Sequence, residues 1–179
     1  MILFLGDSIT EGWKKEGQAH WDAHWAPRGA ENRGHWGDDT DRLVRRIEGG
    51  LLDGLAPEQT VLLIGTNDIP WDPPRAPTSP IPARVVANVT RVVEAVRAKL
   101  PGTELILLGI FPRGEKQDFS RVLIPLVNAG LAQVPGVRFV DLGHVFLEGD
   151  TIPSALMPDT LHLSAAAYER WANALTKII

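Results

Sequence analysis

The sequence predicts an α/β fold in which helices cover both faces of a parallel sheet, giving three layers. Three observations support this: short apolar runs of strand length, longer segments with helical spacing between them, and polar turns directly after the runs. Uninterrupted apolar runs are typical of strands that are buried on both faces. Strands that alternate with helices are joined by crossovers, which make the strands parallel. We expect all of residues 1–179 to form one domain.

The predicted strands are short and mostly aliphatic. They are residues 2–5, 61–64, 105–108 and 137–140, with a brief second strand near 30–32. The predicted helices lie after the capping residues Asp38 and Asp39, at 82–100, near 120–133, and after the capping residue Ser164, with a short one within 18–25. Pro125 predicts that the third of the long helices begins near it or kinks there.

Two regions and one helix face complete this description. Residues 12–36 show no clear period, and a stiff, proline-rich loop covers residues 70–80. The last helix carries a face formed by Tyr168, Trp171, Leu175 and Ile179.

Composition excludes several functional classes. The net charge of −4 and the pI near 5.7 argue against a nucleic-acid partner. No apolar run approaches the roughly 18 residues of a membrane span. The chain has no cysteine, which excludes disulfides, thiolate nucleophiles and zinc–thiolate sites. No secretory signal precedes the first strand, so we expect a cytoplasmic protein.

The turn Gly6-Asp7-Ser8 follows the first apolar run. Open α/β sheets bind ligands at the carboxyl ends of their strands, so Ser8 stands where a nucleophile would be useful. The alternative is an ordinary turn after a strand. We expect Asp7 to brace the turn and to take no part in the chemistry. A catalytic role requires that the rest of the chain supply a base, a group that orients the base and an oxyanion site.

Other polar turns converge on the same edge of the predicted sheet. Asn67 follows the strand at 61–64, and a Phe-Pro-Arg turn at 111–113 follows the strand at 105–108. Near the C-terminus, Asp159 precedes His162 by three residues, which allows its carboxylate to reach the imidazole Nδ1–H and leave Nε2 free to accept a proton. Taken singly, each motif also fits a plain turn or a surface loop.

The order of these motifs resembles that of the SGNH (GDSL-type) serine hydrolases. The matching blocks are Gly6-Asp7-Ser8-Ile9-Thr10, residues 32–40 from Asn32 to Thr40, Gly65-Thr66-Asn67-Asp68, and Asp159-Thr160-Leu161-His162. Residues 109–116 look most like the catalytic subunits of intracellular platelet-activating-factor acetylhydrolase and their bacterial relatives. The resemblance implies a flavodoxin-like sandwich with a five-stranded parallel sheet. The family includes dimers and larger assemblies, so a homo-oligomer is one expected state.

The resemblance also assigns roles by position. It implies that Ser8 is the nucleophile, His162 the base and Asp159 its orienter. The oxyanion hole would be formed by the N–H groups of Ser8 and Gly37 and by the side chain of Asn67. These roles imply a serine esterase that needs no cofactor or metal.

The substrate is expected to be a short-chain, in particular acetyl, ester of a carbohydrate or another small molecule. The alternatives are a lysophospholipase or platelet-activating-factor acetylhydrolase-like lipase, a thioesterase, or a non-catalytic binding module on the same fold. Relatives usually carry small or aliphatic residues between the two glycines of the second block, where this chain has His35 and Trp36.

Residues near the expected cleft raise further hypotheses. Five of the six tryptophans lie outside the predicted core stripes, so we expect some of them to wall the cleft: Trp13, Trp21, Trp25, Trp36 and Trp71. Trp36 lies within the second matching block, and Trp71 follows the third block by three residues. Arg113 either meets an anionic group of the substrate or makes a structural hydrogen bond. The spacing of His20 and His24, with His35 beyond, fixes no carboxylate partner, so we predict no metal site.

Overall fold

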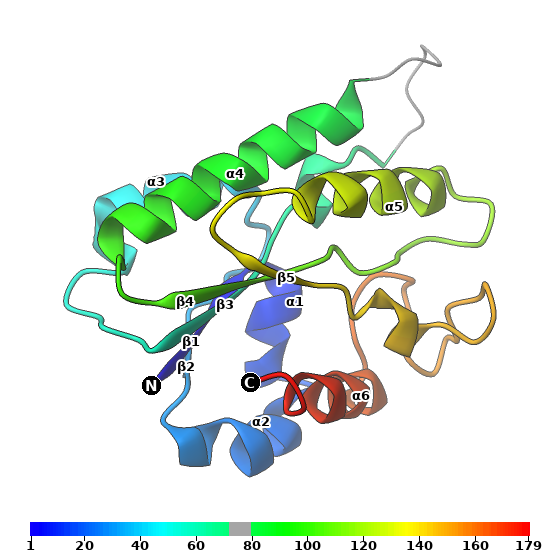
Figure 1. The fold of residues 1–179 in the computed structure, drawn as a ribbon. Coiled ribbons are helices and arrows are strands. Elements are labelled where there is room, and N and C mark those ends of the chain that lie inside the picture. The colour runs from blue at the N-terminus through cyan, green and yellow to red at the C-terminus, as the bar shows by residue number, and fades with distance from the viewer. Residues whose placement is uncertain (72–79) are drawn as a thin grey trace.

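A computed structural model describes residues 1–71 and 80–179. It shows a central sheet of five parallel strands (Figure 1). The predicted proline-rich loop lies largely outside the described residues. The strand order is β2-β1-β3-β4-β5, the order of flavodoxin-like sheets. The strands are β1 (Ile2–Gly6), β2 (Glu31–Asn32), β3 (Gln59–Leu63), β4 (Glu104–Leu108) and β5 (Arg138–Val140). The predicted three-layer parallel architecture is confirmed.

The strand order reverses beside β1, which pairs with β2 on one side and with β3 on the other. Phe4 lies opposite Asn32 in β2 and opposite Val61 in β3. The chain therefore leaves β1 in one direction, returns, and continues on the other side of β1. In open α/β sheets a crevice forms at such a switch point, outside the carboxyl ends of the strands. Ser8 and Asn67 follow the two strands that flank this point.

Helices cover both faces of the sheet (Figure 1). One face carries α3 (Thr40–Arg46), α4 (Ile81–Lys99) and α5 (Ser120–Leu131), and the other carries α1 (Ser8–Glu11), α2 (Gln18–His24) and α6 (Ala165–Leu175). Short 3₁₀ turns complete the described fold at Gly12–Lys14, Ala26–Arg28, Thr66–Asp68 and Gly143–Phe146, and a π turn extends α3 at Ile47–Leu51. No helix in residues 1–71 or 80–179 is long and apolar enough to cross a membrane.

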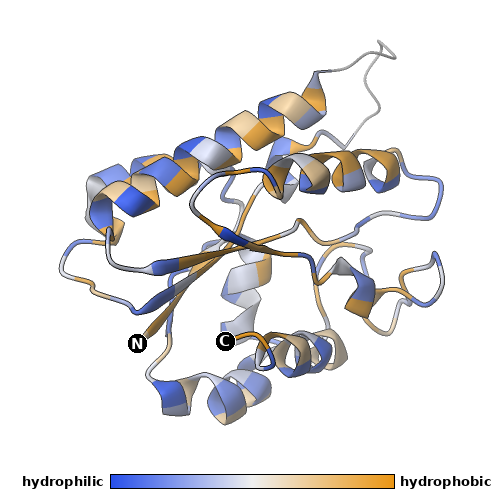
Figure 2. Ribbon diagram, in the orientation of Figure 1, coloured by the Kyte–Doolittle hydropathy of each residue, from blue (hydrophilic) through white to orange (hydrophobic). Residues whose placement is uncertain are grey.

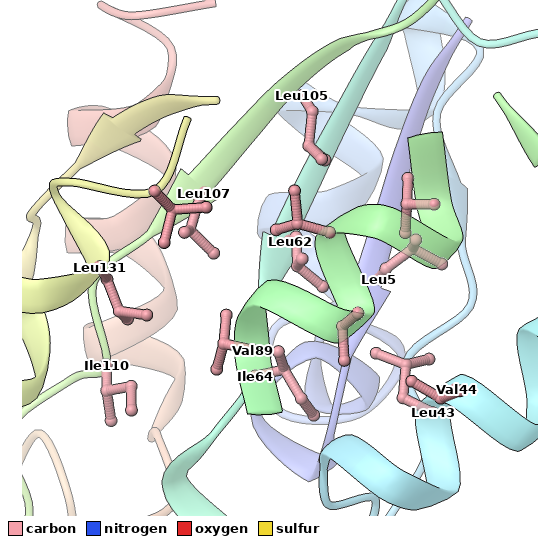
Figure 3. Close-up of a cluster of buried hydrophobic side chains, with 14 of the residues drawn as sticks. Leu5, Leu43, Val44, Leu62, Ile64, Val89, Leu105, Leu107, Ile110 and Leu131 are labelled. Carbon is pink, nitrogen blue, oxygen red and sulfur yellow. The ribbon is translucent and has the colours of Figure 1, made fainter. Parts of the chain in front are cut away.

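The strands contribute alternate residues to two separate apolar clusters. Leu62 and Ile64 pack under α4, whereas Val61 and Leu63 pack on the opposite face with α6. Figure 3 shows the first cluster, where Val89 of α4 lies close to Ile64. Apolar side chains on both faces explain why the strands read as continuous hydrophobic runs rather than as alternating ones. Figure 2 shows these apolar strands between helices with one polar side.

Three of the five tryptophans that lie outside the predicted core stripes are part of the core. Trp13, Trp21 and Trp25 have exposed fractions of 0%, 7% and 0%. They pack with Phe4 of β1 and with α6, where the ring centroids of Trp13 and Trp171 are 4.7 Å apart. Trp21 lies in α2 and Trp25 caps its C-terminus, four residues later. Residues four apart lie on the same side of a helix, so both rings face the sheet.

Two details of the helices differ from the prediction. Helix α5 begins at Ser120, as the range 120–133 predicted, so Pro125 lies inside the helix and the expectation that the helix begins near Pro125 is wrong. Helix α6 ends at Leu175, which leaves Ile179 beyond the helix, although Tyr168, Trp171 and Leu175 are buried as predicted. At the start of α3, the side chain of Asp39 accepts the hydrogen bond from Arg42 N, while Asp38 is buried and has a different role.

Candidate active site

Ser8 is held in a tight turn at the carboxyl end of β1. A side chain at Gly6 would come within 2.2 Å of the Leu63 carbonyl oxygen, so only glycine allows β1 to reach the turn so close to β3. Asp7 caps α1 because its Oδ1 accepts a hydrogen bond of 2.9 Å from Ile9 N. This arrangement places Ser8 in the first turn of α1, with its side chain directed toward His162.

A hydrogen-bonded chain links Ser8, His162 and Asp159. Ser8 Oγ lies 3.0 Å from His162 Nε2, and His162 Nδ1 lies 2.6 Å from Asp159 Oδ2. A carboxylate only accepts, so Nδ1 carries the hydrogen and the neutral ring leaves Nε2 as an acceptor for the serine proton. The structure therefore brings Ser8 to a His–Asp pair that lies more than 150 positions away in the chain, in the geometry of an activated nucleophile.

The second oxygen of Asp159 fixes the orientation of this carboxylate. Asp159 Oδ1 accepts hydrogen bonds from His162 N at 2.7 Å and from Leu161 N at 3.0 Å. Burial works against ionisation, but these bonds and the one from the His162 ring lower the pKa of Asp159. The carboxylate is thus stabilised in the charged form that attracts the Nδ1 hydrogen.

The turn between Asp159 and His162 contains a backbone outlier. Thr160 has φ of 61°, the only positive φ of a residue other than glycine in residues 1–71 and 80–179. A β-branched residue is unfavourable there. The turn is held from both sides, because Thr160 N donates to Met157 O at 3.0 Å and Thr160 O accepts from Gly114 N at 2.9 Å. Strain that is held in place in this way is common where a side chain must be aimed.

The second matching block reaches Ser8 by running beside the end of β1. His35 N donates to Gly6 O at 3.1 Å, which carries the chain past the end of β2 and up to the turn that contains Gly37. Asn32 ties the same segment to α1, because its side chain donates to Thr10 O at 2.8 Å. Gly37 has φ of 73°, a conformation that favours glycine.

Asn67 approaches from the other side of β1. It lies in the 3₁₀ turn Thr66–Asp68 after β3, and its Nδ2 donates to Asp38 O at 2.8 Å. That bond uses one of the two hydrogens of the amide nitrogen and leaves the other for a second acceptor. In the described residues, the N–H groups of Ser8 and Gly37 donate to no protein acceptor.

Arg113 holds the turn that contains Asn67 through hydrogen bonds to backbone carbonyl oxygens. It is 1% exposed and donates to Thr66 O at 3.0 Å and to Ile69 O at 2.8 Å, and burial lowers its pKa. Its guanidinium carbon lies 4.0 Å from the ring centroid of Trp71. Of the two roles that the sequence left open, this geometry favours the structural hydrogen bond over contact with an anionic substrate group.

Two adjoining hollows meet at Ser8, Trp36 and His162. One, of about 510 Å³, is also lined by Gly37, Asn67 and Trp71, together with Asp39, Arg42 and Leu161. The other, of about 470 Å³, extends toward Lys15, Glu16 and Tyr168. Trp36 and Trp71 are 66% and 58% exposed, so these two tryptophans lie at the cleft while the other three are buried.

Several residues around the site were not predicted from the sequence. Asp38 is 2% exposed, and its carboxylate binds Arg46 while its carbonyl holds the Asn67 amide. The carboxylate of Glu11 accepts the Trp36 N–H. The sequence did not indicate these roles of Asp38 and Glu11, because each contact joins segments that come together only in the folded chain.

The side chains that could bind a metal ion do not cluster in the described part of the chain. In residues 1–71 and 80–179, no group of three or more His, Asp or Glu side chains is placed to hold a metal ion.

Comparison with known proteins places the chain among hydrolases. Residues 4–170 match the model of the GDSL-like lipase/acylhydrolase family. Platelet-activating factor acetylhydrolase IB subunit alpha1 of Rattus norvegicus is 29% identical, and the match covers 99% of this chain and 74% of that subunit. The human subunit alpha1 gives the same identity and coverage.

Solved structures show the same fold. A protein from Streptococcus pneumonia whose structure is named for platelet activating factor has a TM-score of 0.79 and 26% identity, covering 99% of this chain and 82% of that one. Axe2-W215I, an acetyl xylan esterase from Geobacillus stearothermophilus, has a TM-score of 0.73 and 22% identity, covering 98% and 92% of the two chains. Together with the match to residues 4–170, these findings show that the chain belongs to the GDSL-like lipase/acylhydrolase family of hydrolases.

Proposed function

We propose that this protein is a serine esterase that hydrolyses short-chain acyl esters, in particular acetyl esters, through an acyl-enzyme. The observation that carries the proposal is the hydrogen-bonded chain from Ser8 Oγ to His162 Nε2 at 3.0 Å and from His162 Nδ1 to Asp159 at 2.6 Å. A serine hydroxyl is a weak nucleophile until a neighbouring base accepts its proton, and this chain supplies that base in the required tautomer.

In the first half of the reaction, Ser8 Oγ forms a bond to the carbonyl carbon of the ester while its proton passes to His162 Nε2. The carbonyl oxygen becomes an oxyanion, which accepts hydrogen bonds from Ser8 N, Gly37 N and Asn67 Nδ2. Each such donor contributes on the order of 3 kcal/mol when it is preorganised. Collapse of the intermediate breaks the bond to the alcohol oxygen, and the imidazolium gives that oxygen its proton.

The second half of the reaction uses the same groups on a water molecule. His162 Nε2 accepts a proton from water as its oxygen attacks the acyl carbon, and the second oxyanion occupies the same donors. Breaking the bond to Ser8 Oγ releases the carboxylic acid, and His162 returns the proton to the serine. Asp159 stays ionised throughout and stabilises the imidazolium.

The acetyl preference rests on the names of the relatives. Both the acetylhydrolase subunits and the acetyl xylan esterase are named for acetyl esters. The exposed rings of Trp36 and Trp71 at the cleft suit either a sugar ring or an alkyl group of the alcohol. The main alternative is a lipase of the platelet-activating-factor acetylhydrolase type, whose substrate would carry a long alkyl chain.

The test of the chemistry is the hydrolysis of p-nitrophenyl acetate by Ser8→Ala. We expect this variant to lose the activity and to retain the circular dichroism spectrum of the parent protein. Near-parental activity in the variant would refute the proposal, and a binding module would show no hydrolysis even in the parent protein.

A substrate panel addresses the alcohol and the acyl chain. Acetylated sugars, acetylated xylan and platelet-activating-factor-like lipids can be compared by acetate release, and p-nitrophenyl esters of increasing length report the acyl limit. We expect the acetate to be the best acyl group, and a preference for long acyl chains would favour a lysophospholipase. Trp36→Ala and Trp71→Ala should lower kcat/KM on the preferred ester. Unchanged values on every ester would show that these rings do not contact substrate.

A further inference from the structure

The turn that carries Gly37 has a conformation that decides where its N–H points. Asp38 N donates to His35 O at 3.2 Å, which makes residues 35–38 a β-turn with Gly37 in its third position. Gly37 has φ of 73° while Trp36 has a negative φ, the combination found in a type II turn. Types I and II differ by about 150° in ψ of the second residue and about 170° in φ of the third, which reverses the central peptide.

The central peptide of this turn joins the Trp36 carbonyl to the Gly37 N–H. Its reversal would point the carbonyl oxygen where the N–H now points. An oxyanion at Ser8 would then face the partly negative carbonyl oxygen of Trp36 instead of the Gly37 N–H donor. The contribution of Gly37 to the oxyanion site therefore depends on which form of the turn is populated.

One side chain acts directly on this peptide. His35 Nδ1 lies 3.0 Å from Trp36 O. A carbonyl oxygen can only accept, so the attraction requires a hydrogen on Nδ1. Asp38 Oδ1, 3.5 Å from the same nitrogen, favours that hydrogen.

The other charged neighbours hold the adjoining peptides. Glu11 accepts the N–H of Trp36, and Arg42 Nη1 donates to Gly37 O at 2.7 Å. They anchor the two ends of the turn, and only His35 among the described residues bonds to the peptide between them.

We infer that His35 is a positioning residue for this reaction, which holds the Trp36–Gly37 peptide in the type II orientation and so aims the Gly37 N–H at the developing oxyanion. The inference rests on the proposed function. It gives a role to a side chain that is 62% exposed and that lines neither of the two hollows at Ser8. It also accounts for a histidine at a position where a small or aliphatic side chain would offer the carbonyl no donor.

Three substitutions of His35 separate the effect of its Nδ1–H donor from the effect of the size of its ring. His35→Ala removes the donor, His35→Asn keeps an N–H near the position of Nδ1, and His35→Gln places its N–H near the position of Nε2. If the type II form falls to about a tenth of the population, kcat falls about tenfold, because only that form has the complete oxyanion site.

We expect His35→Ala and His35→Gln to lower kcat on p-nitrophenyl acetate about tenfold with KM changed less than about twofold, since the oxyanion bond forms only in the transition state. His35→Asn should recover kcat to within about threefold of the parent. The thermal midpoint should stay the same in all three. His144→Ala, an exposed histidine outside both hollows at Ser8, is the matched control and should behave as the parent protein.

The result that overturns this inference is a parental kcat in His35→Ala, or a loss in His35→Asn as large as that in His35→Ala, in an enzyme that Ser8→Ala inactivates. Activity that survives in Ser8→Ala would instead overturn the proposed function, and this inference with it. The two failures are therefore distinguishable.

Discussion

Asp7 is a buried carboxyl group whose charge should destabilise the fold. It is 1% exposed, and burial raises its pKa to about 7, although the bond from Ile9 N and the nearby His162 act in the opposite direction. Its Oδ2 has no hydrogen-bond partner in the described residues. Replacement by asparagine keeps an oxygen for the Ile9 N–H and removes the ionisation.

The size and sign of the effect follow from proton linkage. The folded state holds the Asp7 proton more tightly than the unfolded state, so wild-type stability falls as the pH rises from the unfolded pKa of 3.8 to about 7. The full rise in pKa corresponds to about 4 kcal/mol at 1.36 kcal/mol per unit, and about 2.5 kcal/mol of it develops between about pH 5 and pH 8. Asp7→Asn should therefore become more stable relative to wild type by up to about 2.5 kcal/mol over this interval.

Urea denaturation of both proteins at the two pH values measures this difference. Comparing the two pH values cancels any change in packing that the amide introduces at both. Asp22→Asn, at an exposed carboxylate, is the control and should change by less than about 0.5 kcal/mol. An Asp7→Asn difference that is the same at both pH values, or that shrinks as the pH rises, would refute the reasoning.

Four further predictions concern the site and the core. Asn67→Ala should lower kcat about 10²–10³-fold with a small change in KM, measured on p-nitrophenyl acetate; an equal loss confined to KM would contradict its oxyanion role. Asp159→Asn should lower kcat on the order of 10³–10⁴-fold without unfolding the protein. The side-chain oxygen of the asparagine must accept the hydrogen bonds from Leu161 N and His162 N, so its NH₂ group faces His162 Nδ1 and imposes the wrong imidazole tautomer. Trp13→Ala should lower the free energy of unfolding by about 3–5 kcal/mol in denaturant titrations, and a loss below about 1 kcal/mol would show that this ring is not core. Thr160→Asn should raise the free energy of unfolding by about 1 kcal/mol by relieving the positive φ, and an unchanged midpoint would show that the turn is unstrained.

The sheet could be predicted because its strands are buried on both faces. A run such as residues 61–64 must be apolar throughout when α4 covers one side and α6 the other. The parallel arrangement then brings Ser8 and Asn67 to one edge, whatever their separation in sequence. The sequence indicated β2 only as a brief segment near residues 30–32. In the structure this strand consists of two residues, both paired with β1.

The surroundings of the site could not be predicted because they depend on long-range contacts. Nothing local to Trp13 indicates that Trp171 and Tyr168 will enclose it. The burial of Arg113 depends on carbonyl oxygens of a turn more than 40 positions away. The same holds for Asp38, whose carbonyl meets the Asn67 amide only after β1 and β3 have paired.

The central claim is that Ser8 is a nucleophile activated by His162, and covalent labelling tests it most directly. A fluorophosphonate reacts with an activated serine and remains attached, so peptide mass spectrometry identifies the modified residue. We predict a single adduct on the peptide that contains Ser8, with labelling absent in Ser8→Ala and strongly slowed in His162→Ala. A label on another residue, or labelling of Ser8 at the same rate in His162→Ala, would contradict the account.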